Sequence, residues 1–239
     1  MKGTIVTGAN GFIGSSLIKI LINKGVKVLA VDMSFALPRL PESGFITKIE
    51  SGVDAPLADK IPVGEYDAFY HLAWRGVNGA EKADPTVQLV NIQMAVDCAN
   101  VCKQMGVKKL LCAGTVAENA TYSLPDLEKT SGGMMYGVAK HACRLIVEDY
   151  CKNIGLPFVW MQFSNIYGIG NKTGNLVSYT LSELMAGKEA TFGPALQPYD
   201  FIYVDDLIEA VYRLGVNDTK KSFYYMGSCN PRILKDFLL

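Results

Sequence analysis

The distribution of apolar residues along the chain alternates between short runs and longer stretches with helical spacing. A short apolar run bounded by turn residues is typical of a buried strand, and apolar residues three or four positions apart indicate one face of a helix. Strands are predicted at Ile5–Thr7, Val26–Val31, Asp67–Leu72, Lys108–Cys112 and Phe158–Phe163, with a further short apolar run at Phe45–Ile49. Helices are predicted at Ile13–Ile22, Pro85–Met105, Met134–Cys151 and Leu176–Met185, and another begins at Asp205. This alternation predicts an α/β fold with a doubly wound parallel sheet.

The turn between the first strand and the first helix is rich in glycine and reads Gly8-Ala9-Asn10-Gly11-Phe12-Ile13-Gly14. The first glycine can take backbone angles closed to other residues, the second lets a phosphate approach the main chain, and the third allows the helix to pack tightly on the strand. The free N–H groups and the positive dipole end at the start of the helix favour a diphosphate. The strand–turn–helix context therefore predicts a dinucleotide site.

An acidic residue, Asp32, ends the second predicted strand. A carboxylate at this place can accept hydrogen bonds from both hydroxyls of an adenosine ribose, and it repels a 2′-phosphate. The site is therefore expected to bind NAD in preference to NADP. Asp54, in a loop further along, is equally compatible with a hydrogen bond to an adenine amino group and with capping of the next turn.

After residue 170 the pattern loosens into shorter elements, including an extended piece at Asp200–Val204. We therefore expect an NAD-binding domain at 1–170 and a small substrate-binding lobe at 171–239. The last six residues, Leu234–Leu239, look like the start of an amphipathic helix. The lobe is accordingly expected to be incomplete at its C-terminus.

Composition narrows the choice of partners. The chain has 239 residues, 49% of them hydrophobic, and Lys+Arg and Asp+Glu number 23 each. This balance gives no reason to expect nucleic acid or an anionic membrane as a partner, and no apolar stretch approaches the ~20 residues of a transmembrane helix. Without a signal peptide, the protein is expected to be cytoplasmic. With two histidines, the six cysteines are expected to be buried free thiols, and no metal site is predicted.

Three residues carry the candidate chemistry. Tyr136 and Lys140 lie four positions apart on a predicted helix and share a face. A free tyrosine has a pKa of about 10, but a neighbouring ammonium, or the positive nicotinamide ring of NAD⁺, stabilises the phenolate. Tyr136 is therefore the candidate general acid/base for a sugar hydroxyl, and Thr115 can orient the same oxygen. His71 lies in an apolar run and is interpreted as a packed core histidine rather than a catalytic group.

The chain resembles the extended short-chain dehydrogenase/reductases, of the NAD-dependent epimerase/dehydratase type that acts on nucleotide sugars. The resemblance runs from Lys2 to Leu239 and implies a Rossmann-like fold. Its motifs are Gly8, Gly11 and Gly14, Asp32, His71-Leu72-Ala73, Thr115, Tyr136 with Lys140, Asn165 with Tyr167-Gly168, and the segment Asp200–Asp206. It implies that Thr115, Tyr136 and Lys140 form the catalytic trio.

The resemblance also implies roles for residues around the trio. Lys140 binds the nicotinamide ribose, and Asn165 and Tyr199 face the substrate diphosphate. The helices that contain Val87–Val101 and Val138–Val147 pair two copies into a homodimer. The implied cofactor-binding set is Gly8, Asn10, Gly11, Phe12, Ile13, Gly14, Asp32, Asp54, Leu72, Ala73, Asn91 and Lys140.

The chain also departs from the family pattern. Dehydratases of this family carry an Asp-Glu pair directly after the Thr, where this chain has Val116-Ala117, so dehydration is not expected. At the position where the family usually has an arginine that binds the substrate diphosphate, this chain has Tyr199. At a second position where arginine is common, it has Gln162. Tyrosine offers one neutral donor in place of a bidentate cation.

We therefore expect an NAD-dependent epimerase or oxidoreductase of a nucleotide-activated sugar, with Tyr136 as acid/base. A reductase of a 4-keto-6-deoxy nucleotide sugar is the alternative enzyme. A scaffold that binds a dinucleotide without catalysis is the third interpretation, which the loss of the arginines favours and the intact trio opposes.

Overall fold

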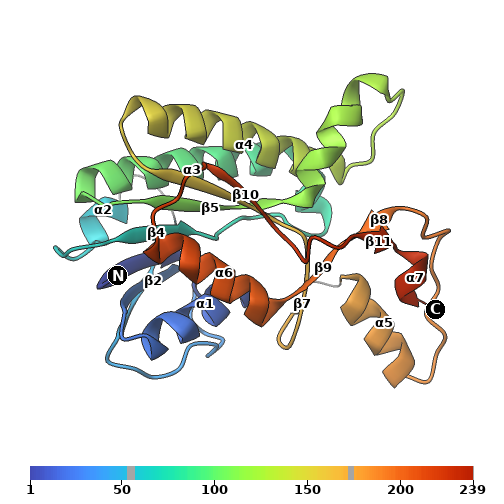
Figure 1. The fold of residues 1–239 in the computed structure, drawn as a ribbon, viewed down its shortest axis with the longest axis horizontal. Helices are drawn as coiled ribbons and strands as arrows, with labels where there is room; N and C mark the ends of the chain where they lie inside the picture. The colour runs from blue at the N-terminus through green and yellow to red at the C-terminus, as the bar shows by residue number, and fades with distance from the viewer. Residues whose placement is uncertain (53–56, 172–174, 239) are drawn as a thin grey trace.

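The computed structural model describes residues 1–52, 57–171 and 175–238. It contains a parallel sheet of seven strands between two layers of helices, with a group of shorter elements at one end (Figure 1). The strand order is β10-β6-β5-β4-β1-β2-β3. The α/β fold with a doubly wound parallel sheet is therefore confirmed.

The bounds of the elements follow the predicted pattern closely. The sheet consists of β1 (Gly3–Thr7), β2 (Lys27–Asp32), β3 (Ile46–Glu50), β4 (Ala68–His71), β5 (Leu110–Thr115), β6 (Phe158–Phe163) and β10 (Phe223–Met226). One face is covered by α2 (Leu57–Lys60), α3 (Pro85–Met105) and α4 (Met134–Asn153), and the other by α1 (Phe12–Asn23) and α6 (Val204–Val216).

Local signals explain the bounds of the longest helix, α3. Asp84 precedes it, and its carboxylate accepts hydrogen bonds from the N–H groups of Thr86 and Val87. Pro85 occupies the first helical position, where a missing N–H is tolerated. Gly106 ends the helix in the left-handed conformation, at φ 65°. The sequence therefore sets both ends of this helix.

The order of the strands places the carboxyl ends of the central ones around one crevice. β1 lies between β2 and β4, so the chain runs outward in one direction through β3 and in the other from β4 onward. Ligands of open parallel sheets bind beyond the carboxyl ends at such a reversal. Thr7, Asp32, His71 and Thr115, the last residues of four strands, all lie along this edge.

Part of the segment expected to form a separate lobe belongs to the main sheet. The buried stripe Val204, Leu207, Ile208 and Val211 of α6 packs in the same core as α1, and β10 pairs in parallel with β6. The boundary expected at residue 171 therefore needs correction, because these apolar surfaces are buried only against the sheet. The strand β10 was not predicted.

The remaining C-terminal elements form the small lobe. It contains α5 (Leu176–Met185), α7 (Lys235–Leu238) and the antiparallel pair of β8 (Pro198–Tyr199) with β11 (Arg232–Ile233). Next to it, β7 (Asn165–Tyr167) pairs in parallel with β9 (Phe201–Tyr203). These elements stand beside the carboxyl end of the sheet (Figure 1).

A second correction concerns the segment around Pro125, which was expected to be a loop. It forms a 3₁₀ helix, η2 (Val116–Asp126). Glu118 reaches back to the N–H of Thr115, while the Thr115 side chain accepts from the N–H of Ala117. A Thr followed three residues later by Glu is the signature of such a capping box, so the sequence did carry the signal.

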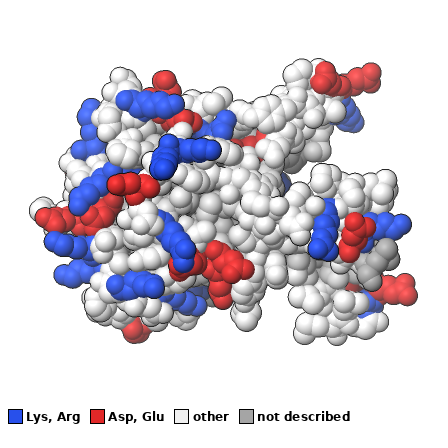
Figure 2. Space-filling view, in the orientation of Figure 1, with Lys and Arg blue, Asp and Glu red and all other residues white. Residues whose placement is uncertain are grey.

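The surface charges intermix (Figure 2), and the cysteines are buried as expected with one correction, Cys229. On the face shown in Figure 2, basic and acidic side chains intermix and neither sign forms a continuous band. Five of the six cysteines are buried free thiols, and Cys229 is exposed. Within the described ranges, no helix has the length and apolarity needed to cross a membrane.

Candidate active site

The glycine turn has the close approaches that its sequence implies. Gly8 has φ 67°, and a Cβ there would lie 2.8 Å from the backbone nitrogen of Ala73. A Cβ on Gly14 would lie 2.1 Å from the carbonyl oxygen of Gly8. The helix α1 begins without a side-chain cap and without an acidic residue in its first turn. Its first N–H groups are therefore suited to a phosphate.

Asp32 lies beside this turn. Its Oδ2 accepts a hydrogen bond from the N–H of Asn10 at 2.8 Å, and its Oδ1 accepts from the N–H of Met33 at 2.8 Å. Each carboxylate oxygen keeps a further lone pair for a ribose hydroxyl. Among the described residues, no donor reaches the buried Oδ1 of Asn10. The turn therefore fits a dinucleotide whose ribose hydroxyls donate to these oxygens.

Replacing Asp32 by Ala is expected to weaken NAD binding and to reduce the discrimination against NADP. The carboxylate supplies acceptors for the ribose and repels a 2′-phosphate, so both effects follow from one charge. Fluorescence titrations of the parent and the variant with both dinucleotides measure this. Tighter binding of NADP than of NAD by the parent protein would contradict the assignment.

The structure brings the candidate trio together. Thr115 is the last residue of β5, and Tyr136 lies in the first turn of α4, where its phenol interacts with the Thr115 side chain. The next residue, Gly137, allows α4 to approach η2: a Cβ there would lie 2.3 Å from the carbonyl oxygen of Ala117. Lys140 follows one helical turn later and is buried. Tyr136 and Thr115 therefore lie close together at the carboxyl end of β5.

Lys140 has more partners than the sequence indicated. Its Nζ donates a hydrogen bond of 2.6 Å to the carbonyl oxygen of Ala113 and lies 3.7 Å from the centre of the Trp74 ring. Burial lowers the pKa of Lys140 to about 8. Trp74 also packs edge-on against Tyr136, with ring centres 6.2 Å apart. This tryptophan directly follows the His71-Leu72-Ala73 motif, and sequence reasoning gave it no role.

The protein groups alone do not lower the pKa of Tyr136. Burial raises it to about 12, although the hydrogen bond to Thr115 acts in the opposite direction. The predicted activation of Tyr136 also involves the positive nicotinamide ring of NAD⁺, so its role as acid/base stays a prediction. Desolvation of the phenolate is the largest cause of this shift, and the Lys140 ammonium is engaged by Ala113 and Trp74.

Glu118 is a buried carboxylate under the trio that sequence reasoning missed. Its residue is 2% exposed. Oε1 accepts from the N–H of Thr115 at 2.6 Å, and both carboxylate oxygens lie 3.1 Å from the indole nitrogen of Trp160. Burial raises the pKa of Glu118, and the hydrogen bond from Thr115 lowers it. Glu118 thereby fixes the backbone of Thr115.

A cleft of about 300 Å³ opens next to Thr115, between the sheet and the small lobe. Asn165 and Tyr199, which were predicted to bind substrate, line it, and Phe12 and Ile13 line it from the glycine turn. Gln162 does not face this cleft: its amide donates to Asn119 Oδ1 at 3.1 Å and lies 3.5 Å from Glu118 Oε2. It thus belongs to the buried network beneath Thr115.

The remaining residues predicted to bind the cofactor differ in what they contact. Leu72 and Ala73 pass directly beside Gly8. The amide of Asn91 is occupied by the backbone of Arg75 and Val87, so it holds the loop after β4, and its role in binding the cofactor stays a prediction. Asp54 lies outside the described residues.

The structure confirms that His71 is a core histidine. It is buried, and its Nδ1 lies 2.9 Å from Thr7 Oγ1 and 3.3 Å from Cys98 Sγ. Burial, with the charge of Lys140, lowers the pKa of His71 to about 3. The ring is therefore neutral at physiological pH.

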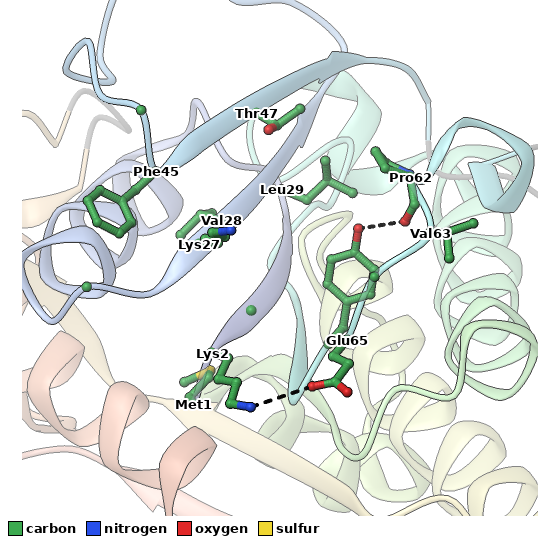
Figure 3. A pocket seen from close by; sticks show the side chains of 15 residues that line it. Met1, Lys2, Lys27, Val28, Leu29, Phe45, Thr47, Pro62, Val63 and Glu65 are labelled. Atoms are coloured by element: carbon green, nitrogen blue, oxygen red, sulfur yellow. Dashed lines mark hydrogen bonds and ion pairs between the residues drawn. The ribbon is translucent and has the colours of Figure 1, made fainter.

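A larger hollow of about 610 Å³ lies at the opposite, amino-terminal edge of the sheet (Figure 3). Its walls include Lys2 and Glu65, whose side chains are 3.9 Å apart, and Val63. None of the candidate catalytic residues lines it. Because ligands of such sheets bind at the carboxyl edge, the smaller cleft beside Thr115 is the candidate site.

Comparison with known proteins identifies the family of the chain. The model of the NAD dependent epimerase/dehydratase family matches residues 4–227. The chain belongs to this family. NAD is the family's cofactor, and the glycine turn with Asp32 is the part of this chain that fits it.

Individual members of the NAD dependent epimerase/dehydratase family share less than a third of their residues with this chain in the following comparisons. A dTDP-6-deoxy-L-talose 4-dehydrogenase (NAD(+)) of Aggregatibacter actinomycetemcomitans is 28% identical over 85% of this chain and 76% of that protein. A UDP-glucose 4-epimerase of Mycolicibacterium smegmatis is 27% identical over 89% of this chain and 72% of that protein. The structure of a UDP-N-acetylglucosamine 4-epimerase from Methanobrevibacter ruminantium, in complex with UDP-N-acetylmuramic acid, has the same fold, with a TM-score of 0.82 and 23% identity. That alignment covers 99% of this chain and 79% of the other.

Proposed function

We propose that the protein is an NAD-dependent epimerase or oxidoreductase that acts on a nucleotide-activated sugar. The observation that carries the proposal is the grouping of Thr115, Tyr136 and Lys140 at the edge that also holds the glycine turn and Asp32, with Thr115 lining the cleft. Family members with related sequences act on UDP- and dTDP-linked sugars. The cytoplasm is the proposed location.

In the proposed mechanism, bound NAD⁺ supplies the hydride acceptor. Tyr136 takes the proton of the sugar hydroxyl that is oxidised, and it returns a proton when the sugar is reduced again. Thr115 Oγ1 holds the same oxygen in the orientation required for transfer. Lys140 would bind the nicotinamide ribose through its ammonium, which donates a hydrogen bond to the Ala113 carbonyl in this structure. Asn165 and Tyr199 support the diphosphate.

Two features favour epimerisation or simple oxidation and reduction over loss of water. The positions after Thr115 are Val116 and Ala117, which cannot donate or accept the protons that dehydration requires. The buried carboxylate that is present, Glu118, accepts hydrogen bonds from Thr115 and Trp160 and does not line the cleft. A 4-keto-6-deoxy sugar reductase remains the second candidate, and a scaffold without activity the third.

A single-turnover experiment tests the proposal. NAD⁺-loaded protein is mixed with UDP- and dTDP-linked hexoses, and the absorbance of NADH is followed. An epimerase forms NADH transiently without added cofactor, whereas a reductase consumes added NADH in each turnover. Mass spectrometry of the denatured protein identifies any dinucleotide or sugar nucleotide that co-purifies. Absence of hydride transfer with every such sugar would leave the scaffold interpretation.

We further propose that the protein forms a homodimer through α3 and α4. These helices pack side by side on one face of the sheet, yet Leu89 of α3 and Leu145 of α4 remain 65% and 51% exposed. Val90 and Ile146 add to this apolar surface. Light scattering at micromolar concentration is expected to give a dimer mass, and Leu145→Asp to give a monomer because it places a charge in the buried interface. A monomer mass for the parent protein would refute this.

A further inference from the structure

The cleft has one cation among its described lining residues, and it does not come from the positions where the family carries arginine. That cation is Lys82, in the 3₁₀ helix η1 (Ala80–Ala83) just before α3. The family's arginine positions hold Tyr199, which is neutral, and Gln162, which is bound to η2. The positive charge of this cleft therefore comes from η1 and not from the positions of Tyr199 and Gln162.

The surroundings of Lys82 hold the ammonium at the reaction centre. Its Nζ lies 5.4 Å from the centre of the Tyr136 ring, and its side chain passes Gly133, the residue before α4, where an added Cβ would lie 4.0 Å from Nζ. Lys82 is half-buried. Its contact with the aromatic face is a cation–π interaction, which fixes the side chain without neutralising its charge.

Within the described ranges, no carboxylate pairs with Lys82. The adjacent Glu81 forms an ion pair with Arg75 at 2.6 Å, and Asp84 accepts the N–H groups that begin α3. The first turn of α4 contains no acidic residue. A half-buried ammonium beside the acid/base, with both neighbouring carboxylates engaged elsewhere, is suited to an anionic group of the substrate.

We propose that Lys82 binds an anionic oxygen group of the substrate next to the reacting carbon, and that this group is a carboxylate on the sugar. The inference rests on the proposed function and specifies its substrate class as a nucleotide-linked uronic acid. Such a substrate carries two anionic groups, the carboxylate and the diphosphate, and the position of Lys82 indicates which of them it binds. Lys82 stands at Tyr136, where the sugar reacts, whereas the residues proposed for the diphosphate, Asn165 and Tyr199, come from β7 and β8.

Calorimetric titration of the NAD⁺-loaded protein tests this with three probes: UDP-glucuronate, UDP-glucose and UDP. The first two differ only in a carboxylate at the sugar. Lys82→Met is expected to weaken the binding of UDP-glucuronate about 10- to 100-fold, the usual effect of losing a charge-assisted hydrogen bond. It is expected to weaken the binding of UDP-glucose less than about 3-fold. Lys82→Arg is expected to keep the preference. Lys103→Met, on the exposed end of α3, removes the same charge at a distance and serves as the control.

Each other outcome has a defined meaning. If Lys82→Met weakens all three probes equally, Lys82 binds the phosphates and the carboxylate assignment is overturned. If Lys82→Met changes none of them while the parent protein binds them, the inference fails and the proposed function stands. If the parent protein binds none of the three, the uronic-acid inference is overturned, and the single-turnover experiment with dTDP-linked hexoses decides the proposed function. Higher ionic strength is expected to reduce the preference for UDP-glucuronate in the parent protein but not in Lys82→Met.

Discussion

Replacing Tyr136 by Phe is expected to slow the reduction of bound NAD⁺ by a nucleotide sugar by about 10²- to 10⁴-fold, the usual contribution of general acid–base catalysis. The substitution keeps the ring that packs against Trp74 and removes only the oxygen that interacts with Thr115. NAD affinity is therefore expected to stay nearly unchanged. Stopped-flow measurement of single turnovers separates the two effects.

Related variants show whether the trio acts as proposed. Lys140→Met is expected to impair both turnover and NAD binding, because one ammonium serves the tyrosine and the ribose. Thr115→Val is expected to cost about 10-fold, since one neutral hydrogen bond is worth roughly 1.4 kcal/mol. Tyr122→Phe, an exposed tyrosine on η2, is the matched control and is expected to behave like the parent protein. A Tyr136→Phe protein that reduces NAD⁺ at the parent rate would rule out the mechanism.

The pKa of Tyr136 adds a test of how the base is activated. Burial holds it at about 12, so at neutral pH the phenol keeps its proton unless a further positive charge enters the site. The nicotinamide ring of NAD⁺ carries that charge, and it is expected to lower the pKa of Tyr136. The difference in tyrosinate absorbance between the parent protein and Tyr136→Phe, followed against pH with and without NAD⁺, measures the shift.

Most of the fold was predictable because its signals are local. The helix over Pro85–Met105 has a cap, a proline and a terminal glycine within its own sequence, and the glycine turn lies between a strand and a helix that both have clear periodicity. The strand β10 was missed because four residues, Phe223–Met226, carry too little pattern of their own. Its place is set by pairing with β6, which is distant in sequence. The predicted start of the small lobe at residue 171 needed correction for the same reason, because α6 and β10 join the main sheet through contacts that are distant in sequence.

The site was predictable only where the residue type itself indicates chemistry. Thr115, Tyr136 and Lys140 are identified by their spacing and position after a strand, and the structure brings them together. Glu118 and Lys82 resemble surface charges in the sequence. The first is buried because Trp160, far along the chain, donates to it, and the second faces the cleft because η1 packs beside α4. Such roles arise from tertiary contacts alone.

Replacing Glu118 by Ala is expected to destabilise the protein by about 2–5 kcal/mol, since buried donors lose a charged acceptor. The N–H of Thr115 and the indole N–H of Trp160 would both be left without a partner in a buried network. Gly114 makes this network possible: a Cβ there would lie 2.2 Å from the indole nitrogen and 2.7 Å from Glu118 Oε1. Urea denaturation measures the change, with Glu128→Gln on the exposed loop as the control.

Glu118→Gln separates the charge of Glu118 from its structural role. The amide oxygen can still accept from Thr115, so the fold is expected to survive while the negative charge is lost. That charge raises the pKa of both Tyr136 and Lys140, because it favours the protonated form of each. Its removal is therefore expected to move the pH dependence of single-turnover NAD⁺ reduction toward lower pH, since Tyr136 then loses its proton at lower pH. A slower reaction with an unchanged pH profile would show that Glu118 acts only by holding Thr115 in place.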